Sequence, residues 1–430
     1  MKISRELQIA GMMAACAFFT LAGYEFIRSA STVLFKQAYG ADSLPMVMAV
    51  MPIVVFLGLM LYSRTLSRFG PRLTLMFTTS ASAVIILACY FVILTGNKPI
   101  TAVLYLVKEF YIVLLIEQYW SYINSSLSRD TAKRVNGPIT GIAGIGGAAG
   151  GWGLALLAEP MGTEAMVLIA SLALVPAVVL GNLTYALHGE PQPSGATERS
   201  AAPQSTGHMG LRLFLSNRVL RYLLAIVFTS QIVSAVLDLK FQALLSVEYA
   251  GQTDKEAAFQ GWFFGTLSTS VLVLQFIVAP ALMSVLSLRL VHILMPLIHV
   301  AAIAVAIIEP SVLTVGLALF LFKAFDYSMF RAAKEVLYIP FSFDVRYRAK
   351  EVIDVFGYRA GKGVSSAAIV FLQRVGMAVS GFYLQIALAC VALWLVLIFP
   401  LTSSADAAAR AVEEGESGPS ERERDGAAAD

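Results

Sequence analysis

Three charged residues stand in the stretch FRAAKEVLYIP, residues 330–340, inside a segment that is otherwise apolar enough to cross a membrane. Arg331 and Lys334 are about one helical turn apart, and Glu335 follows directly. Charges at membrane depth are unfavourable unless they pair with one another or face a polar cavity. Because arginine offers a planar fork of donors and lysine a point charge, two such cations on one helix could bind a phosphate or another anion.

Further ionisable residues stand in other apolar segments of the chain. They are Glu25 and Arg28 in the first segment, Lys108, Glu109 and Glu117 in the fourth, Asp238 and Lys240 in the seventh, Lys323 and Asp326 in the tenth, and Asp354, Arg359 and Lys362 in the eleventh. The first and seventh segments hold equivalent places in the two halves of the chain, as do the fourth and tenth. We expect their charges to line one central cavity, although single opposite pairs could instead link helices structurally.

The composition predicts an all-α integral membrane protein. Of 430 residues, 58% are hydrophobic and only 14% are charged, whereas about a quarter of a soluble domain is charged. Apolar runs near the ~20 residues that cross a bilayer recur along almost the whole chain. The formal net charge of +3 gives no reason to expect a nucleic-acid partner.

Twelve transmembrane helices are expected, grouped as two halves of six. The predicted spans are 9–35, 45–63, 73–95, 100–127, 138–159 and 163–187, then 217–247, 257–285, 289–308, 311–340, 349–374 and 379–401. This pattern divides the chain into halves at 1–187 and 217–401. The segment 188–216 is rich in Pro, Ser and Gly, which predicts a cytoplasmic linker, and 402–430 is expected to be a disordered cytoplasmic tail.

Basic residues in the short loops predict the orientation. They gather after the second, fourth and tenth spans: Arg64, Arg68 and Arg72, then Arg129, Lys133 and Arg134, then Arg346, Arg348 and Lys350. Cations are enriched in cytoplasmic loops, so we expect both termini in the cytoplasm and the protein in the bacterial inner membrane. Lipid is the expected surrounding, and the protein is expected to be a monomer.

Two six-helix halves joined by a long central loop are the plan of major-facilitator-like transporters, which bind substrate near the membrane midplane between the halves. The glycine-rich stretch GIAGIGGAAGGWG, residues 141–153, favours close helix packing over ligand contact, because small residues four apart let helices approach. No metal site, cofactor or enzymatic nucleophile–base pair is expected from the residue spacing.

The stretch around Lys334 resembles the ATP/ADP translocases of plastids and intracellular bacteria. The matching pieces are Lys334-Glu335, Tyr338-Ile339-Pro340, Lys350, Ile353-Asp354-Val355 and Gly361-Lys362. Weaker similarities lie in YEFIRSAST, LIEQYWSYIN and LDLKFQ. The resemblance implies a nucleotide-exchange carrier whose substrate-contacting charges are Arg28, Glu117, Asp238 and Lys334.

The first span departs from this family. There an arginine is followed by Asp, Thr, Lys and Asp, whereas here Arg28 is followed by Ser29, Ala30, Ser31 and Thr32. The missing lysine contacts substrate in the family, and no residue next to Ser31 in the sequence replaces it. This difference makes a related but less charged solute a plausible substrate.

Roles can be assigned to the charges on this basis. Arg28, Arg331 and Lys334 are expected to hold the anionic part of the substrate, with Glu117 and Asp238 beside them. Residues for gating or coupling are Glu25, Glu109, Lys240, Glu335 and Asp354. Tyr24, Tyr119 and Trp120 could stack on a base, although packing is the more common role of such residues.

Two other readings remain open on the sequence. One is a proton-coupled carrier or exporter of another small metabolite, in which Glu117 or Asp238 titrates. The other is a membrane sensor or an assembly partner that transports nothing and whose charges are locked in ion pairs.

Overall fold

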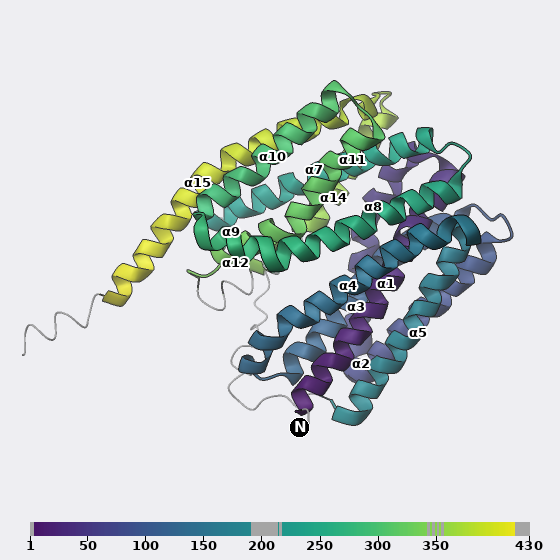
Figure 1. Ribbon diagram of the computed structural model, residues 1–430, viewed down its shortest axis with the longest axis horizontal. Coiled ribbons are helices and arrows are strands. Elements are labelled where there is room, and N and C mark those ends of the chain that lie inside the picture. The colour runs from purple at the N-terminus through teal and green to yellow at the C-terminus, as the bar shows by residue number, and fades with distance from the viewer. Residues whose placement is uncertain are drawn as a thin grey trace, which may run out of the picture.

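The computed structural model describes residues 4–190, 214, 217–341, 345, 349–350, 352–353 and 357–417, and these form helices joined by short turns (Figure 1). The long helices of the first half are α1 (Arg5–Tyr39), α2 (Leu44–Ile93), α3 (Pro99–Ser126), α4 (Arg129–Met161) and α5 (Thr163–His188). Those of the second half are α7 (Arg218–Glu248), α8 (Thr253–Val273), α10 (Leu288–Ile308), α11 (Val312–Phe325), α14 (Tyr358–Arg374) and α15 (Tyr383–Ser417).

Shorter elements extend or connect these helices. Two are 3-10 turns, η1 (Ala41–Ser43) and η5 (Val379–Phe382). Two are π-helical turns, η2 (Leu274–Val278) and η3 (Asp326–Phe330), each followed by a short helix, α9 (Ala279–Val285) and α12 (Arg331–Leu337). The π turns therefore lie inside two continuous passages, Thr253–Val285 and Val312–Leu337.

Ten helices in the described part of the chain are long and apolar enough to cross a membrane, so the protein is a multi-pass membrane protein. One of them, α2, has 50 residues, far more than the about 20 that one span needs. It bends at Gly70, whose φ of 76° suits glycine because a side chain would clash there, and Pro71 follows directly. The segments 45–63 and 73–95 lie in the two arms of this helix, on either side of the bend.

Each half of the chain has its own hydrophobic core. One core is formed mainly by α1 to α5, and the other mainly by α7 to α15. At one end of the molecule, each core includes residues from the other half of the chain. Ala257 and Ala258 of α8 belong to the first core, whereas Phe35 of α1 and Val47 of α2 belong to the second.

This end, where α1 ends at Tyr39 and α8 begins at Thr253, is called the closed end here. From it the two groups of helices diverge toward the N-terminal end, where α1 begins (Figure 1). A polar contact adds to the packing at the closed end: the N–H and hydroxyl of Thr163 donate to Asp254 at 2.7 and 2.6 Å.

The glycine-rich helix α4 packs directly on α8 of the other half. A methyl group on Gly151 would lie 2.5 Å from the backbone N and Cα of Gly265, and one on Gly261 would lie 2.4 Å from the backbone N of Ala155. The helices are thus in contact backbone to backbone, which only glycines permit. This is the close packing that the stretch at 141–153 predicts.

Polar side chains hold the ends of the first-half helices together. Glu6 of α1 accepts hydrogen bonds from the backbone N–H of Ser128 at 3.0 Å and from the Thr131 hydroxyl, where α4 begins. A carboxylate at a helix N-terminus satisfies unpaired donors and complements the helix dipole. The N-terminal end of this half is therefore fixed by its own side chains.

The ends of the second half differ in part from the expected boundaries. Helix α15 continues past residue 401 to Ser417, so part of the segment expected to be a disordered tail is helical. Most of the expected linker 188–216 lies outside the described residues, as do the residues after 417. In the expected span 349–374, the described helix is α14, which has 17 residues.

Candidate functional site

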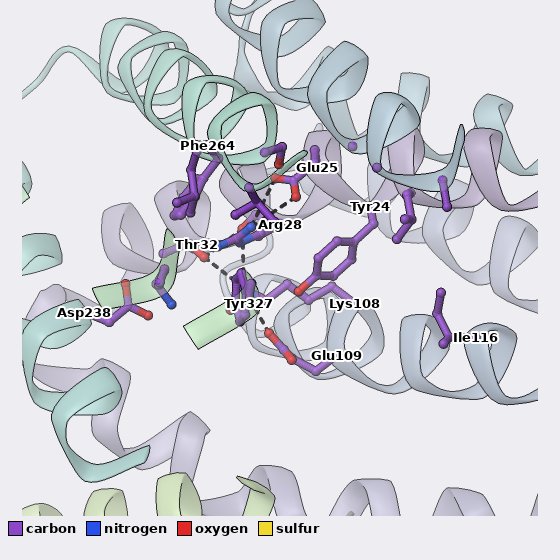
Figure 2. A pocket seen from close by; sticks show the side chains of 18 of the residues that line it. Tyr24, Glu25, Arg28, Thr32, Lys108, Glu109, Ile116, Asp238, Phe264 and Tyr327 are labelled. Atoms are coloured by element: carbon purple, nitrogen blue, oxygen red, sulfur yellow. Dashed lines mark hydrogen bonds and ion pairs between the residues drawn. The ribbon is translucent and has the colours of Figure 1, made fainter. Parts of the chain in front are cut away.

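A cavity of about 450 Å³ lies between the two halves, lined by residues of α1, α3, α7, α8, α14 and the passage Val312–Leu337 (Figure 2). Its charged lining consists of Glu25, Arg28, Lys108, Glu109, Asp238, Lys323, Arg331 and Lys362. Such a volume is within the range of small-molecule sites, about 300 to 1,000 Å³. Charged side chains at membrane depth are explained when they face a cavity of this kind.

Helix α1 supplies one wall through a row of residues three and four apart. Arg28 donates to both carboxylate oxygens of Glu25, at 3.1 and 3.2 Å, and its guanidinium lies 3.6 Å from the ring centroid of Phe264. One turn further, Thr32 also lines the cavity. Phe264 belongs to α8, so the contact joins the halves beside the cavity.

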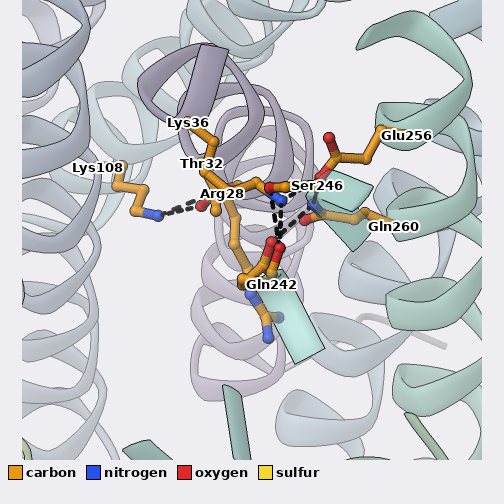
Figure 3. A network of polar contacts seen from close by, with 8 residues as sticks. All are labelled: Arg28, Thr32, Lys36, Lys108, Gln242, Ser246, Glu256 and Gln260. Carbon is orange, nitrogen blue, oxygen red and sulfur yellow. Dashed lines mark hydrogen bonds and ion pairs between the residues drawn. The ribbon is translucent and has the colours of Figure 1, made fainter. Parts of the chain in front are cut away.

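Lys108 of α3 reaches the same wall. Its Nζ donates to Thr32 Oγ1 at 2.9 Å and to the backbone carbonyl of Arg28 at 3.3 Å, and it lies 4.0 Å from Glu109 (Figures 2 and 3). Ser31 itself is fully buried. Lys108 thus brings an ammonium group to the cavity beside Thr32, the residue that follows Ser31.

The second half supplies the opposing wall. Lys323, Tyr327 and Arg331 recur every four residues along one passage, and all three line the cavity. The π turn η3 lies between Lys323 and Arg331. A π turn holds more residues than an α turn, so Lys323 and Arg331 lie closer to one face of the passage than they would in a regular α-helix. Asp238 of α7 and Lys362 of α14 complete this wall.

Aromatic side chains cover the first-half side of the cavity. Tyr24, Tyr119 and Trp120 all line it, and the rings of Tyr119 and Trp120 meet edge to face at 5.0 Å. Within the part of the chain that the structure describes, the buried hydroxyl of Tyr119 has no hydrogen-bond partner.

A buried polar network runs from the cavity to the closed end (Figure 3). Lys36 of α1 forms an ion pair with Glu256 of α8 and donates to the backbone carbonyl of Gln242 of α7 at 3.2 Å. Gln260 donates to Gln242 and to Glu256, at 3.1 and 3.2 Å. Since Lys36 belongs to one half and its partners to the other, the network fastens the halves together.

The structure brings together five of the residues that the sequence indicated: Glu25, Arg28, Glu109, Asp238 and Arg331. Four others do not line the cavity. Glu117 is exposed on α3, and Lys240 is partly buried on α7. Lys334 is buried with its Nζ 5.0 Å from the ring centroid of Tyr358, and Glu335 forms an ion pair with Lys350. Asp354 lies outside the described residues.

Several cavity residues were not assigned a role from the sequence. They are Lys108, Lys323, Lys362, Tyr327, Gln242 and Gln260. The three lysines lie in apolar segments, which was a usable signal, but their helix faces could not be determined from spacing alone. Lys36 and Glu256, whose ion pair fastens the two halves together, stand near the ends of their expected spans, where charged residues are ordinary.

No group of three or more His, Cys, Asp or Glu side chains within the described ranges is arranged to hold a metal ion.

Beside the cavity, a smaller pocket of about 210 Å³ shares Glu109, Tyr327 and Lys362 with it.

Comparison with solved structures shows the fold. A variant of the nucleoside transporter NupG superposes with a TM-score of 0.64 at 13% identity, covering 93% of this chain and 100% of that one. A D-xylose–proton symporter gives 0.65 at 14%, covering 90% and 96%. A bacterial homologue of the iron transporter ferroportin, in an inward-facing state, gives 0.66 at 12%, covering 92% and 99%. These identities show a shared transporter fold and nothing about substrate.

Comparison of the sequence points to one family. Residues 215–404 match the TLC ATP/ADP transporter family, which confirms the resemblance of the stretch around Lys334; the weaker similarities in YEFIRSAST and LIEQYWSYIN lie outside the match. No curated protein matches the chain. The family and the fold indicate a carrier rather than an enzyme. The chain is therefore a membrane transporter with a major-facilitator-like fold, and its second half, residues 215–404, matches the TLC ATP/ADP transporters.

Proposed function

We propose that the protein carries a nucleotide or a related anionic metabolite across the bacterial inner membrane by alternating access, using the cavity between its halves. The observation that carries this proposal is the charged lining of that cavity. Five basic and three acidic side chains face it, drawn from both halves of the chain. A cavity with an excess of cations at membrane depth favours an anionic solute.

The arrangement of the halves supports alternation. The network of Lys36 and Glu256 and the glycine contacts of α4 with α8 close one end of the cavity. Opening that end requires these contacts to separate while the opposite end closes, with the bound solute kept between the halves. The protein would do this as a monomer in the lipid bilayer.

A complete topology of twelve spans fits this proposal. To the ten long apolar helices we add the second passage of α2 and the helix α14. The halves would then be 1–187 and 217–401, joined by the linker 188–216. With the basic loops in the cytoplasm, both termini are cytoplasmic, and the conformation described here faces inward.

Transport by purified protein in proteoliposomes tests the proposal. Labelled nucleotide outside should exchange for nucleotide inside, and a protonophore should leave the exchange unchanged. If uptake needs no internal nucleotide and collapses with the protonophore, a proton-coupled carrier is supported instead. The carboxylates of Glu25, Glu109 and Asp238 would supply the proton acceptors in that case. Flux of no organic anion would contradict the proposed function.

A pair of lysine variants ties the flux to the cavity. Lys323→Gln removes a cation from the lining, and uptake is expected to fall at least tenfold because the anion loses a charged contact. Lys255→Gln is the matched control, since Lys255 is exposed, lies outside the cavity lining and donates to Gln252, the residue before α8. Equal uptake by the two variants would show that the anion does not use this cavity.

A further inference from the structure

The charge balance of the cavity restricts the charge of its solute. The lining has five basic side chains, Arg28, Lys108, Lys323, Arg331 and Lys362, and three acidic ones, Glu25, Glu109 and Asp238. This leaves a formal excess of two positive charges. Because an uncompensated charge at membrane depth is unfavourable, a dianion neutralises the cavity, whereas a trianion or tetraanion overfills it with negative charge.

The cations of the first half are already engaged by protein groups. Both carboxylate oxygens of Glu25 accept hydrogen bonds from Arg28, and Phe264 covers its guanidinium. Lys108 donates to Thr32 and to a backbone carbonyl and has Glu109 beside it. These two residues have less capacity for a new anion than the cations opposite them.

The cavity cations of the second half differ from those of the first in having no carboxylate partner within the described ranges. Throughout the described ranges, Lys323, Arg331 and Lys362 have no carboxylate oxygen within ion-pair distance. Lys323 is only 3% exposed, so its ammonium group has little water as well. Three cations on one wall of the cavity, none within ion-pair distance of a carboxylate, can supply the donors that a phosphate group requires.

Aromatic side chains line both walls, with Phe264 and Tyr327 on the second half and a larger group on the first. Tyr24 of α1 and Trp120 of α3 line the first-half side of the same cavity. A solute that spans the cavity would therefore have its anionic group on the second half and its apolar or planar part on the first.

From this geometry we propose that the cavity selects a dianionic phosphate monoester that carries a planar ring, such as a nucleoside monophosphate. Lys323, Arg331 and Lys362 bind its phosphate, which carries a charge of about −1.5 to −2 at pH 7. Tyr24 and Trp120 contact its ring. This inference rests on the proposed function and narrows it, because nucleoside diphosphates and triphosphates carry more charge than the cavity compensates.

A competition series tests the charge selectivity. Adenosine, AMP, ADP and ATP share one ring and sugar, so they differ in charge and phosphate number. In proteoliposomes that exchange labelled AMP, with chelator present to remove divalent cations, unlabelled AMP should compete at least tenfold better than ATP or adenosine. If ATP or ADP competes as well as AMP, the proposed selectivity is wrong while the carrier function stands. If none of the four is transported or competes while another organic anion is carried, the proposed selectivity fails and the carrier function stands; flux of no organic anion at all contradicts both.

A charge variant gives a second readout that general damage would not produce. Glu109→Gln removes one negative charge from the lining with little change in shape. The ratio of AMP to ADP uptake should then shift about tenfold toward ADP, because the cavity now compensates one more negative charge. Glu159→Gln is the control, since Glu159 is exposed on α4 outside the cavity, and its ratio should equal that of the unmodified protein. An unchanged ratio in Glu109→Gln overturns the charge argument.

Discussion

Gly151→Ala is expected to slow transport at least tenfold, although it adds a single methyl group. That methyl would lie 2.5 Å from the backbone of Gly265, and a backbone cannot move aside as a side chain can. Overfilled contacts of this kind cost about 1 to 3 kcal/mol, and each ~1.4 kcal/mol changes an equilibrium tenfold. The variant therefore disfavours the conformation in which α4 and α8 touch, and a carrier that cannot adopt it cannot complete its cycle.

The same helix provides the control for this result. A methyl on Gly141 would lie 3.5 Å from the ring of Phe276, which is an ordinary van der Waals contact. Gly141→Ala should therefore exchange substrate within about twofold of the unmodified protein. Initial exchange rates in proteoliposomes, normalised to the amount of reconstituted protein, give both values. The role of the α4–α8 contact would be refuted if Gly151→Ala were as active as Gly141→Ala.

Lys36→Met is expected to reduce transport at least thirtyfold. The substitution leaves Glu256 buried in the closed end without its cation, and breaking a buried pair in this way costs about 3 to 5 kcal/mol. That penalty falls on the conformation in which the halves are fastened, so the closed end opens too readily.

A second substitution distinguishes loss of the ion pair from general damage. In Lys36→Met/Glu256→Gln no unpaired charge remains, and the neutral side chain can still accept from Gln260. This double variant should regain at least tenfold of the lost exchange. Lys255→Met, next to Glu256 but exposed, should behave as the unmodified protein. A double variant no more active than Lys36→Met would mean that the ion pair does not govern the closed end.

The fold could be predicted largely from hydropathy. A chain that crosses a bilayer needs long apolar segments, and in lipid these form helices because a helix hydrogen-bonds its own backbone N–H and C=O groups. Two details required three-dimensional information. The two arms of α2 adjoin without a loop, because the non-helical backbone of Gly70 ends the first arm and Pro71 follows at the start of the second. Helix α15 extends to Ser417 through a polar segment whose composition indicated disorder.

The sequence indicated which helices line the cavity, but it did not indicate which face of each helix does so. Charges on the first, fourth, seventh and tenth spans do meet, since Arg28, Glu109, Asp238 and Arg331 share one cavity. Counting residues as a regular α-helix put Lys334 on the face of Arg331, yet Lys334 lies buried against Tyr358. Arg331 and Lys334 both lie in α12, after the π turn, and a step of three residues sets Lys334 to one side of Arg331, where it packs against α14.

Contacts between distant segments were the least predictable part. Lys108 lies beside Thr32 because α3 packs on α1, and Lys36 meets Glu256 across the two halves. Each of these residues has an unremarkable position in its own segment. Their partners become visible only when the helices are assembled.

The most direct test of the account is the accessibility of the cavity from the two sides of the membrane. Ser268 lines the cavity from α8 and is partly exposed, so Ser268→Cys places a thiol there once Cys16, Cys89 and Cys390 are replaced by alanine. A membrane-impermeant thiol reagent should react at least tenfold faster from the side of the N-terminus. The transported anion should slow that reaction, and completed modification should stop exchange. Equal reaction from both sides without any effect of the anion would contradict a central, alternately opened transport cavity.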